Sequence, residues 1–99
     1  MRRYKFLKKD ALYAALNRLR AALLAAEDGH DVENIMLAVL SHDERIKIGR
    51  RIEIAEMIRD GVGYDEIRQQ MQVGKGTIAN VVSKLEKYPD GYNLINRRI

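Results

Sequence analysis

The chain has 99 residues, a formal net charge of +4, a hydrophobic fraction of 46% and no cysteine. This length suits one domain, predicted to span residues 1–99, whose modest core would gain from a partner surface. The lack of cysteine excludes disulfides and thiolate metal sites, and it fits a cytoplasmic location. The sequence shows no apolar run typical of a signal peptide or a membrane span, so no membrane partner is expected.

The charges are unevenly distributed along the chain. Residues 1–9 carry five cations and no acid, whereas residues 27–44 carry six acids without Lys or Arg. The last segment, residues 75–99, is basic again. Basic ends on both sides of an acidic middle suggest a polyanionic partner. The basic start either forms an arm on such a partner or only keeps the chain in solution.

Apolar residues at helical spacing predict a first long helix over about residues 4–27. Four leucines form its stripe at positions i, i+4, i+7 and i+11: Leu12, Leu16, Leu19 and Leu23. Asp28 and Gly29 are expected to end this helix, because Gly readily adopts the left-handed conformation of a helix cap. Asp31 is then expected to cap a short apolar helix over residues 32–40.

Ser41 and Glu44 have the spacing of a capping box, in which each side chain accepts a hydrogen bond from the other residue's backbone N–H. This pair predicts the start of a third helix over about residues 43–60. Its apolar residues are expected to form one buried face: Ile48, Ile52 and Ala55, with Ile54 and Ile58 beside it. The fold class expected from these patterns is all-α, because no segment alternates as a strand does.

Residues 64–87 form the most informative segment, since they are predicted to be two short helices, 64–71 and 75–87, joined by a tight turn. The apolar residues of both helices would face each other: Ile67 and Met71 on the first, and Ile78, Val81, Val82 and Leu85 on the second. From Lys75 to Lys84, the outer face of the second helix carries short or cationic residues and no acid: Lys75, Gly76, Thr77, Ala79, Asn80, Ser83 and Lys84.

Such an outer face suits a recognition helix in the major groove of double-stranded DNA, where small side chains permit close approach. Lys75, Gly76, Ala79 and Asn80 are expected to face base edges. The remaining candidates, expected to contact phosphate or to steer association, are Arg68, Thr77, Ser83 and Lys84. The alternative is an ordinary helical hairpin with a solvated outer face, although such a face usually carries Glu–Lys pairs.

From about residue 35 to residue 85, the sequence resembles the tryptophan-repressor superfamily. The matching text is LSHDERIKIGRRIEIAEMIRDG, followed by YDEIRQQMQVGKGTIANVV. The resemblance implies an intertwined, all-helical homodimer with a C-terminal helix-turn-helix, in which residues 1–60 provide dimerisation helices. The leucine stripe would then be the dimer seam; packing within its own chain is the alternative. It also implies a sequence-specific transcriptional regulator, expected to be a repressor of a near-palindromic operator.

The sequence departs from the superfamily where tryptophan-responsive members hold their ligand between two arginines. Arg51 matches the first arginine, but Asn80 stands at the second, and Asn cannot stack as a guanidinium plane does. Val81 replaces the glycine that lies against the ligand. We therefore expect no cofactor and no response to L-tryptophan, and leave open a different effector near Arg51. Arg50 and Arg51 would line such a pocket, contact phosphate, or pair with nearby carboxylates.

The turn of the predicted helix-turn-helix is also unusual. Gln72 stands where Gly is common, so Gln72 must adopt a left-handed conformation or the turn must differ. Gly74 replaces the usual Ser or Thr cap, and Gly76 lies inside the recognition helix, where Gly costs up to about 1 kcal/mol relative to Ala. Residues 88–99 are expected to form a short extension, with a turn at Pro89, Asp90 and Gly91 before one or two helical turns.

Nothing in the sequence indicates catalysis or a metal site. His30 and His42 are the only histidines and have no cysteine to accompany them, so a zinc site is not expected. Paired carboxylates and nucleophile–base sets are absent from the motifs, and we expect no enzyme. The main functional alternative is a helical dimeric module that binds another protein and not DNA.

Overall fold

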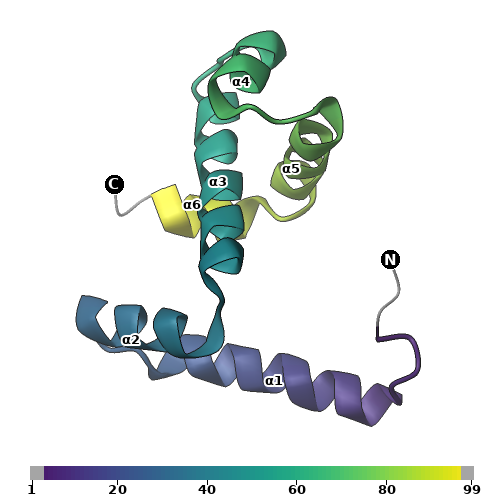
Figure 1. Ribbon diagram of the computed structural model, residues 1–99, viewed down its shortest axis with the longest axis vertical. Coiled ribbons are helices and arrows are strands. Elements are labelled where there is room, and N and C mark those ends of the chain that lie inside the picture. Colours follow the sequence, from purple (N-terminus) through teal and green to yellow (C-terminus); the bar gives the residue numbers. More distant parts are fainter. Residues whose placement is uncertain (1–3, 97–99) are drawn as a thin grey trace. The chain divides into compact units, whose positions relative to one another are not determined.

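The computed structural model describes residues 4–96, and within that range it contains six helices and no strand (Figure 1). The all-α fold class is therefore confirmed. The helices are α1 (Lys9–Ala25), α2 (Gly29–Val39), α3 (His42–Arg59), α4 (Tyr64–Met71), α5 (Lys75–Lys87) and α6 (Pro89–Asn96). The chain divides into two compact units, Met1–Ser41 and His42–Ile99. The single domain over residues 1–99 stays a prediction.

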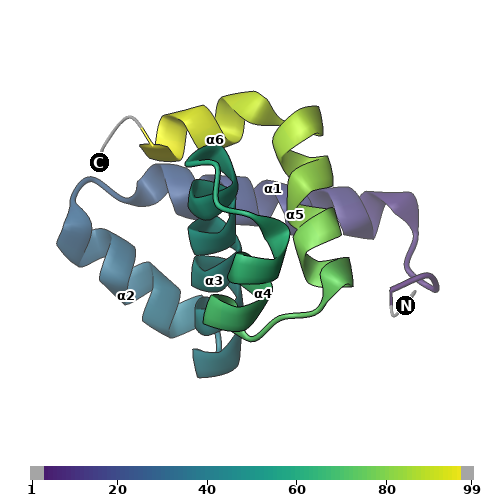
Figure 2. The same cartoon turned by 90° about the horizontal axis from the view of Figure 1, so that it is seen from above.

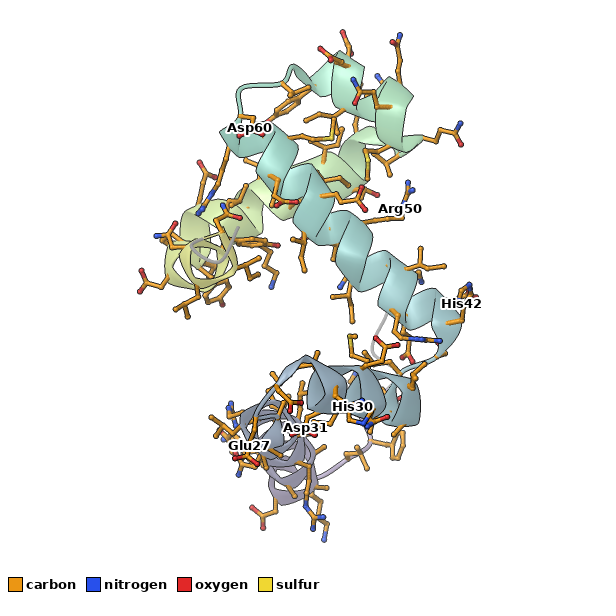
Figure 3. All side chains as sticks on the ribbon, turned by 90° about the vertical axis from the view of Figure 1, so that its left-hand side faces the viewer. Glu27, His30, Asp31, His42, Arg50 and Asp60 are labelled. Atoms are coloured by element: carbon orange, nitrogen blue, oxygen red, sulfur yellow. The ribbon has the colours of Figure 1, made fainter. Side chains whose placement is uncertain are left out.

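The first unit contains α1 and α2, which contact each other. The structure corrects the expected cap between them. The Asp28 side chain caps α2 by accepting a hydrogen bond from the Asp31 backbone N–H at 2.9 Å. Asp31 in turn accepts from the Glu27 N–H at 3.0 Å (Figure 3). Asp28 and Gly29 therefore begin a helix and do not end one, since a carboxylate satisfies the free N–H groups of a first turn.

No residue of α1 or α2 is buried. The exposed fractions of the leucine stripe rise along the helix: 38% for Leu12, 48% for Leu16, 52% for Leu19 and 69% for Leu23. An amphipathic helix usually buries its apolar stripe against another surface. The stripe is thus available for a partner, but the dimer seam stays a prediction. Arg2 and Arg3 of the basic start lie outside the described residues.

The second unit is built around α3, against which α4, α5 and α6 pack (Figure 2). Its core consists of six buried residues: Ile54, Ala55, Ile67, Met71, Ile78 and Val81. The predicted buried face of α3 is only partly right, because Ala55 is buried whereas Ile48 is 41% exposed. Helices α4, α5 and α6 cover the C-terminal half of α3, so the isoleucines in its first half remain exposed.

The expected turn at residues 89–91 is wrong, because Pro89 begins α6. Pro suits the first position of a helix, where a backbone N–H would have no intrahelical partner. Tyr88, the residue before it, leaves the helical conformation with φ −130° and ψ 58°, as the ring of a following Pro favours. Helix α6 returns to α3 and α5, and Tyr92 packs against the core. Residues 97–99 of the predicted extension lie outside the described residues.

Candidate nucleic-acid interface

Helices α4 and α5 have the bounds predicted for the helix-turn-helix, Tyr64–Met71 and Lys75–Lys87. Their facing apolar residues are buried as expected: Ile67 is fully buried, and Ile78 and Val81 are at most 3% exposed. Val82 and Leu85 are partly buried against the same core. These contacts, together with those to α3, fix the two helices as one rigid hairpin.

Of the two alternatives that the sequence left open for the turn, the structure shows the left-handed one. Gln72 adopts the left-handed conformation, with φ 54° and ψ 52°, in the place where Gly is common. Gly74 occupies the N-cap position of α5 in an extended conformation. The Cβ position of Gly76 has no atom within 4 Å, so Gly76 faces open space and not a packed neighbour. The start of the candidate recognition helix is therefore sterically open.

The outer face of α5 is free for a ligand. All seven α5 residues assigned to DNA contact are exposed: Lys75, Gly76, Thr77, Ala79, Asn80, Ser83 and Lys84. The structure thus brings together the set that the sequence singles out, with no carboxylate between Lys75 and Leu85. The Lys84 ammonium lies 5.3 Å from the centre of the Tyr88 ring, which orients this cation near the end of the face.

Arg68, the eighth candidate, is located on α4 and is engaged by an acid. Its Nη1 atom lies 3.7 Å from Oδ1 of Asp65, with the two side chains 41% and 95% exposed. The spacing of three residues is typical of a helical ion pair, so the sequence contained a signal for this contact. A phosphate that contacted Arg68 would therefore have to compete with Asp65 for the guanidinium.

Replacing Asp65 with Asn is expected to raise affinity for duplex DNA about two- to fivefold, the range of an exposed ion pair. The change releases Arg68 and removes a charge that repels phosphate. Titration of labelled duplex measures the effect, with Asp60→Asn at the end of α3 as the control for net charge. Equal gains in the two variants would assign the effect to net charge and not to Arg68.

Arg50 has a partner that the sequence did not indicate. Its Nη2 atom donates a hydrogen bond to the backbone carbonyl of Met71, the last residue of α4. This bond involves none of the partners considered from the sequence, which were a small-molecule ligand, a phosphate or a nearby carboxylate. A contact between a side chain and a backbone atom 21 residues away follows no periodic pattern, so no sequence signal could have found it.

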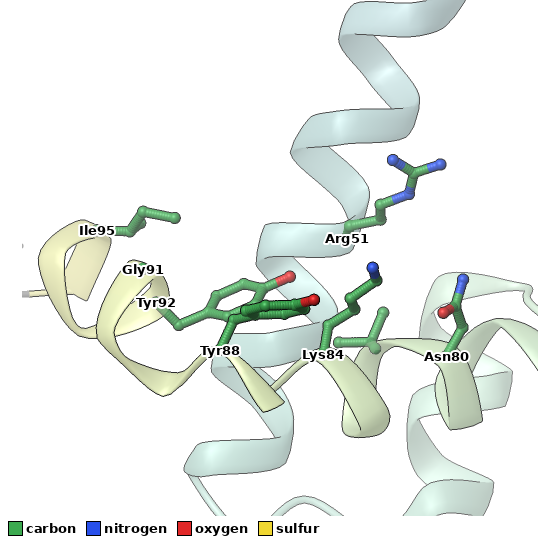
Figure 4. A pocket seen from close by; sticks show the side chains of 8 residues that line it. Arg51, Asn80, Lys84, Tyr88, Gly91, Tyr92 and Ile95 are labelled. Atoms are coloured by element: carbon green, nitrogen blue, oxygen red, sulfur yellow. The ribbon is translucent and has the colours of Figure 1, made fainter. Parts of the chain in front are cut away.

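Two cavities lie beside α5, and both are lined by Arg51, Asn80 and Val81. The larger, about 470 Å³, extends to α6 and includes Lys84, Tyr88 and Tyr92 (Figure 4). The smaller, about 270 Å³, includes Lys47, Arg50 and Thr77. No carboxylate lines either cavity. Arg51 and Asn80 are thus brought together as the resemblance implies, in surroundings that favour an anionic group.

Residues 4–96 contain no cluster of three or more His, Cys, Asp or Glu side chains that could hold a metal ion. Over the same residues, no helix is both long and apolar enough to span a membrane.

Helices α4 and α5 pack as a hairpin on a buried core, and the outer face of α5 is exposed and free of acids from Lys75 to Lys84, which defines a helix-turn-helix of the kind found in DNA-binding proteins. A family model described as Trp repressor protein matches residues 14–99, and the chain belongs to this family. The family is one of DNA-binding helix-turn-helix regulators. No curated protein and no solved structure matches the chain.

Proposed function

We propose that this protein is a sequence-specific regulator of transcription, a repressor, that binds double-stranded DNA as a cytoplasmic homodimer. The observation that carries the proposal is the outer face of α5, which is exposed over seven candidate residues and holds no acid from Lys75 to Lys84. The hairpin beneath that face is held by a buried core. A rigid helix with small and cationic outer residues can enter the major groove and contact both phosphates and base edges.

The open leucine stripe of α1 supports the homodimer. Four leucines on one face of this helix are 38–69% exposed, and the first unit buries no residue of α1 or α2. A contiguous apolar face of this kind marks an association surface. Two copies joined there would present two α5 helices, which suits two half-sites about one DNA turn apart, roughly 34–36 Å.

The cavities beside Arg51 support regulation without L-tryptophan. Asn80 provides an amide where tryptophan-responsive relatives place a second cation, and Val81 is 3% exposed within the core. In this proposal the protein either binds DNA unaided or responds to a different small molecule held near Arg51. The cationic lining, with no carboxylate, fits a ligand that carries an anionic group.

The test separates base contacts from phosphate contacts on α5. Asn80→Ala is expected to change sequence preference by about 1–3 kcal/mol for each lost base contact. Lys84→Ala should weaken binding to all duplexes alike, because a phosphate contact carries no sequence information. Titrations against the selected site, its point variants and random duplex measure both effects.

Asn93→Ala on α6 is the matched control, since Asn93 is exposed and lies outside the candidate interface. Unchanged DNA binding in both Asn80→Ala and Lys84→Ala would show that α5 is not the recognition helix. Failure of the wild-type protein to bind any duplex would instead favour the protein-interaction module.

A further inference from the structure

The turn between α4 and α5 combines two conformational demands. Met71 ends α4, and carbonyls of a last helical turn have no intrahelical partner. The next residue, Gln72, is held at φ 54° and ψ 52°, a left-handed conformation that a non-glycine residue adopts only at a cost. Something must therefore favour this turn over the alternatives open to Gln72.

Arg50 lies where it can stabilise the left-handed turn at Gln72. It projects from α3, the helix on which the hairpin rests, and donates a hydrogen bond to the Met71 carbonyl (Figure 3). The bond is partly buried, which limits competition from water. A hydrogen bond from a charged donor is stronger than one between neutral groups. It fixes the direction of the carbonyl immediately before the left-handed residue.

The candidate recognition helix depends on that turn for its direction. It begins only three residues after Gln72, and its N-cap residue, Gly74, has no side chain with which to cap the helix. Gly76 in its first turn faces open space. The N-terminal end of α5, which carries Lys75 and Gly76 toward base edges in the proposed function, thus has few constraints of its own.

We propose that Arg50 is a positioning residue: by holding the Met71 carbonyl, it locks the left-handed turn at Gln72 and aims the start of α5 at DNA. The effect on DNA rests on the proposed function, whereas the link between Arg50 and Gln72 is a property of the folded chain alone. The two can therefore be tested separately.

The first arm is a double-mutant cycle on unfolding, measured by denaturant titration at one protein concentration without DNA. Arg50→Met keeps the aliphatic stem but removes the donors, and it should raise the unfolding equilibrium constant about tenfold or more. Gln72→Gly should lower that constant, because Gly adopts the left-handed conformation freely. In the Arg50→Met background, Gln72→Gly should lower the constant by a factor about threefold smaller than in the wild type, because without the Arg50 bond Gln72 is free to leave the left-handed conformation.

Additive effects, within about twofold, would overturn the link between Arg50 and Gln72. Arg50→Lys provides a second variant in case Arg50→Met fails to fold. Because one N–H is enough for this single carbonyl, Lys should restore most of the stability. No rescue by Lys would also contradict the proposed contact.

The second arm measures DNA affinity for the selected site and for random duplex, with Lys47→Met as the control. Lys47 lies on the same helix and is also a cation, so this variant matches the loss of charge. Arg50→Met should reduce the ratio of specific to nonspecific affinity about tenfold, whereas Lys47→Met should weaken both affinities together. If the double-mutant cycle shows coupling but the ratio of affinities is unchanged, Arg50 does not orient α5 toward DNA. Its effect on the turn at Gln72 would still hold. Absence of DNA binding by the wild type would refute the proposed function without touching the cycle.

Discussion

Replacing Leu16 or Leu19 with Asp is expected to unfold the chain and not to produce a stable monomer. Both leucines lie on the open stripe of α1, about half exposed in the single chain, and become buried in the proposed dimer. An unpaired carboxylate in an apolar interface is strongly unfavourable, by several kcal/mol or more. The first unit buries no residue of α1 or α2, so it has no core of its own to keep these helices folded without the dimer contact.

Circular dichroism and sedimentation at micromolar concentration measure the two parts of this prediction, the helix content and the association state. Asn17→Asp is the matched control, because it introduces the same charge on α1 at an exposed residue that pairs with Arg20 instead of belonging to the stripe. This control should remain folded and dimeric. A well-folded, monomeric wild-type protein would refute the seam.

L-Tryptophan is expected to bind at least about two orders of magnitude more weakly than in the tryptophan-responsive relatives, and not to strengthen DNA binding. Of the two arginine positions that hold the ring in those relatives, only that of Arg51 keeps an arginine here, and the missing second cation forfeits a contact typically worth about 0.5–2 kcal/mol. Val81 is buried among core residues, where the ring would need room, and overpacking typically costs about 1–3 kcal/mol. Both terms act in the same direction.

Calorimetric titration with L-tryptophan, paired with DNA titrations with and without it, decides this point. The expected result is no measurable heat at micromolar protein and identical DNA affinity in both titrations. Micromolar binding that also tightens DNA affinity would restore the amino-acid sensor. L-Phenylalanine is the control ligand, since it shares the amino-acid groups but has a smaller ring.

The sequence predicts the helix-turn-helix well because its apolar residues have a single arrangement that buries them. Ile67, Ile78 and Val81 can only face one another if the two helices form a hairpin, and the structure buries all three. For Gln72 the sequence left two alternatives, a left-handed conformation or a different turn, and the structure shows the first. The helical spacing that places the apolar residues of α5 on its inner face also places the remaining residues on its exposed outer face.

Other features could not be predicted because one local pattern fits two structures. Asp28 followed by Gly29 can end a helix or begin one, and only the bond to the Asp31 N–H distinguishes the two. A Pro such as Pro89 can likewise mark a turn or the first position of a helix. The isoleucines of α3 occur on several sides, so its buried face depends on where α4 and α5 pack.

The central claim is that α5 gives this protein sequence-specific affinity for duplex DNA. The most direct measurement selects bound sites from random duplexes and then titrates the selected and random duplexes at two salt concentrations. We expect a specific affinity at least about 10³-fold above the nonspecific one, with both affinities falling steeply as salt rises. Equal affinity for selected and random duplexes, or no binding at low salt, would contradict it.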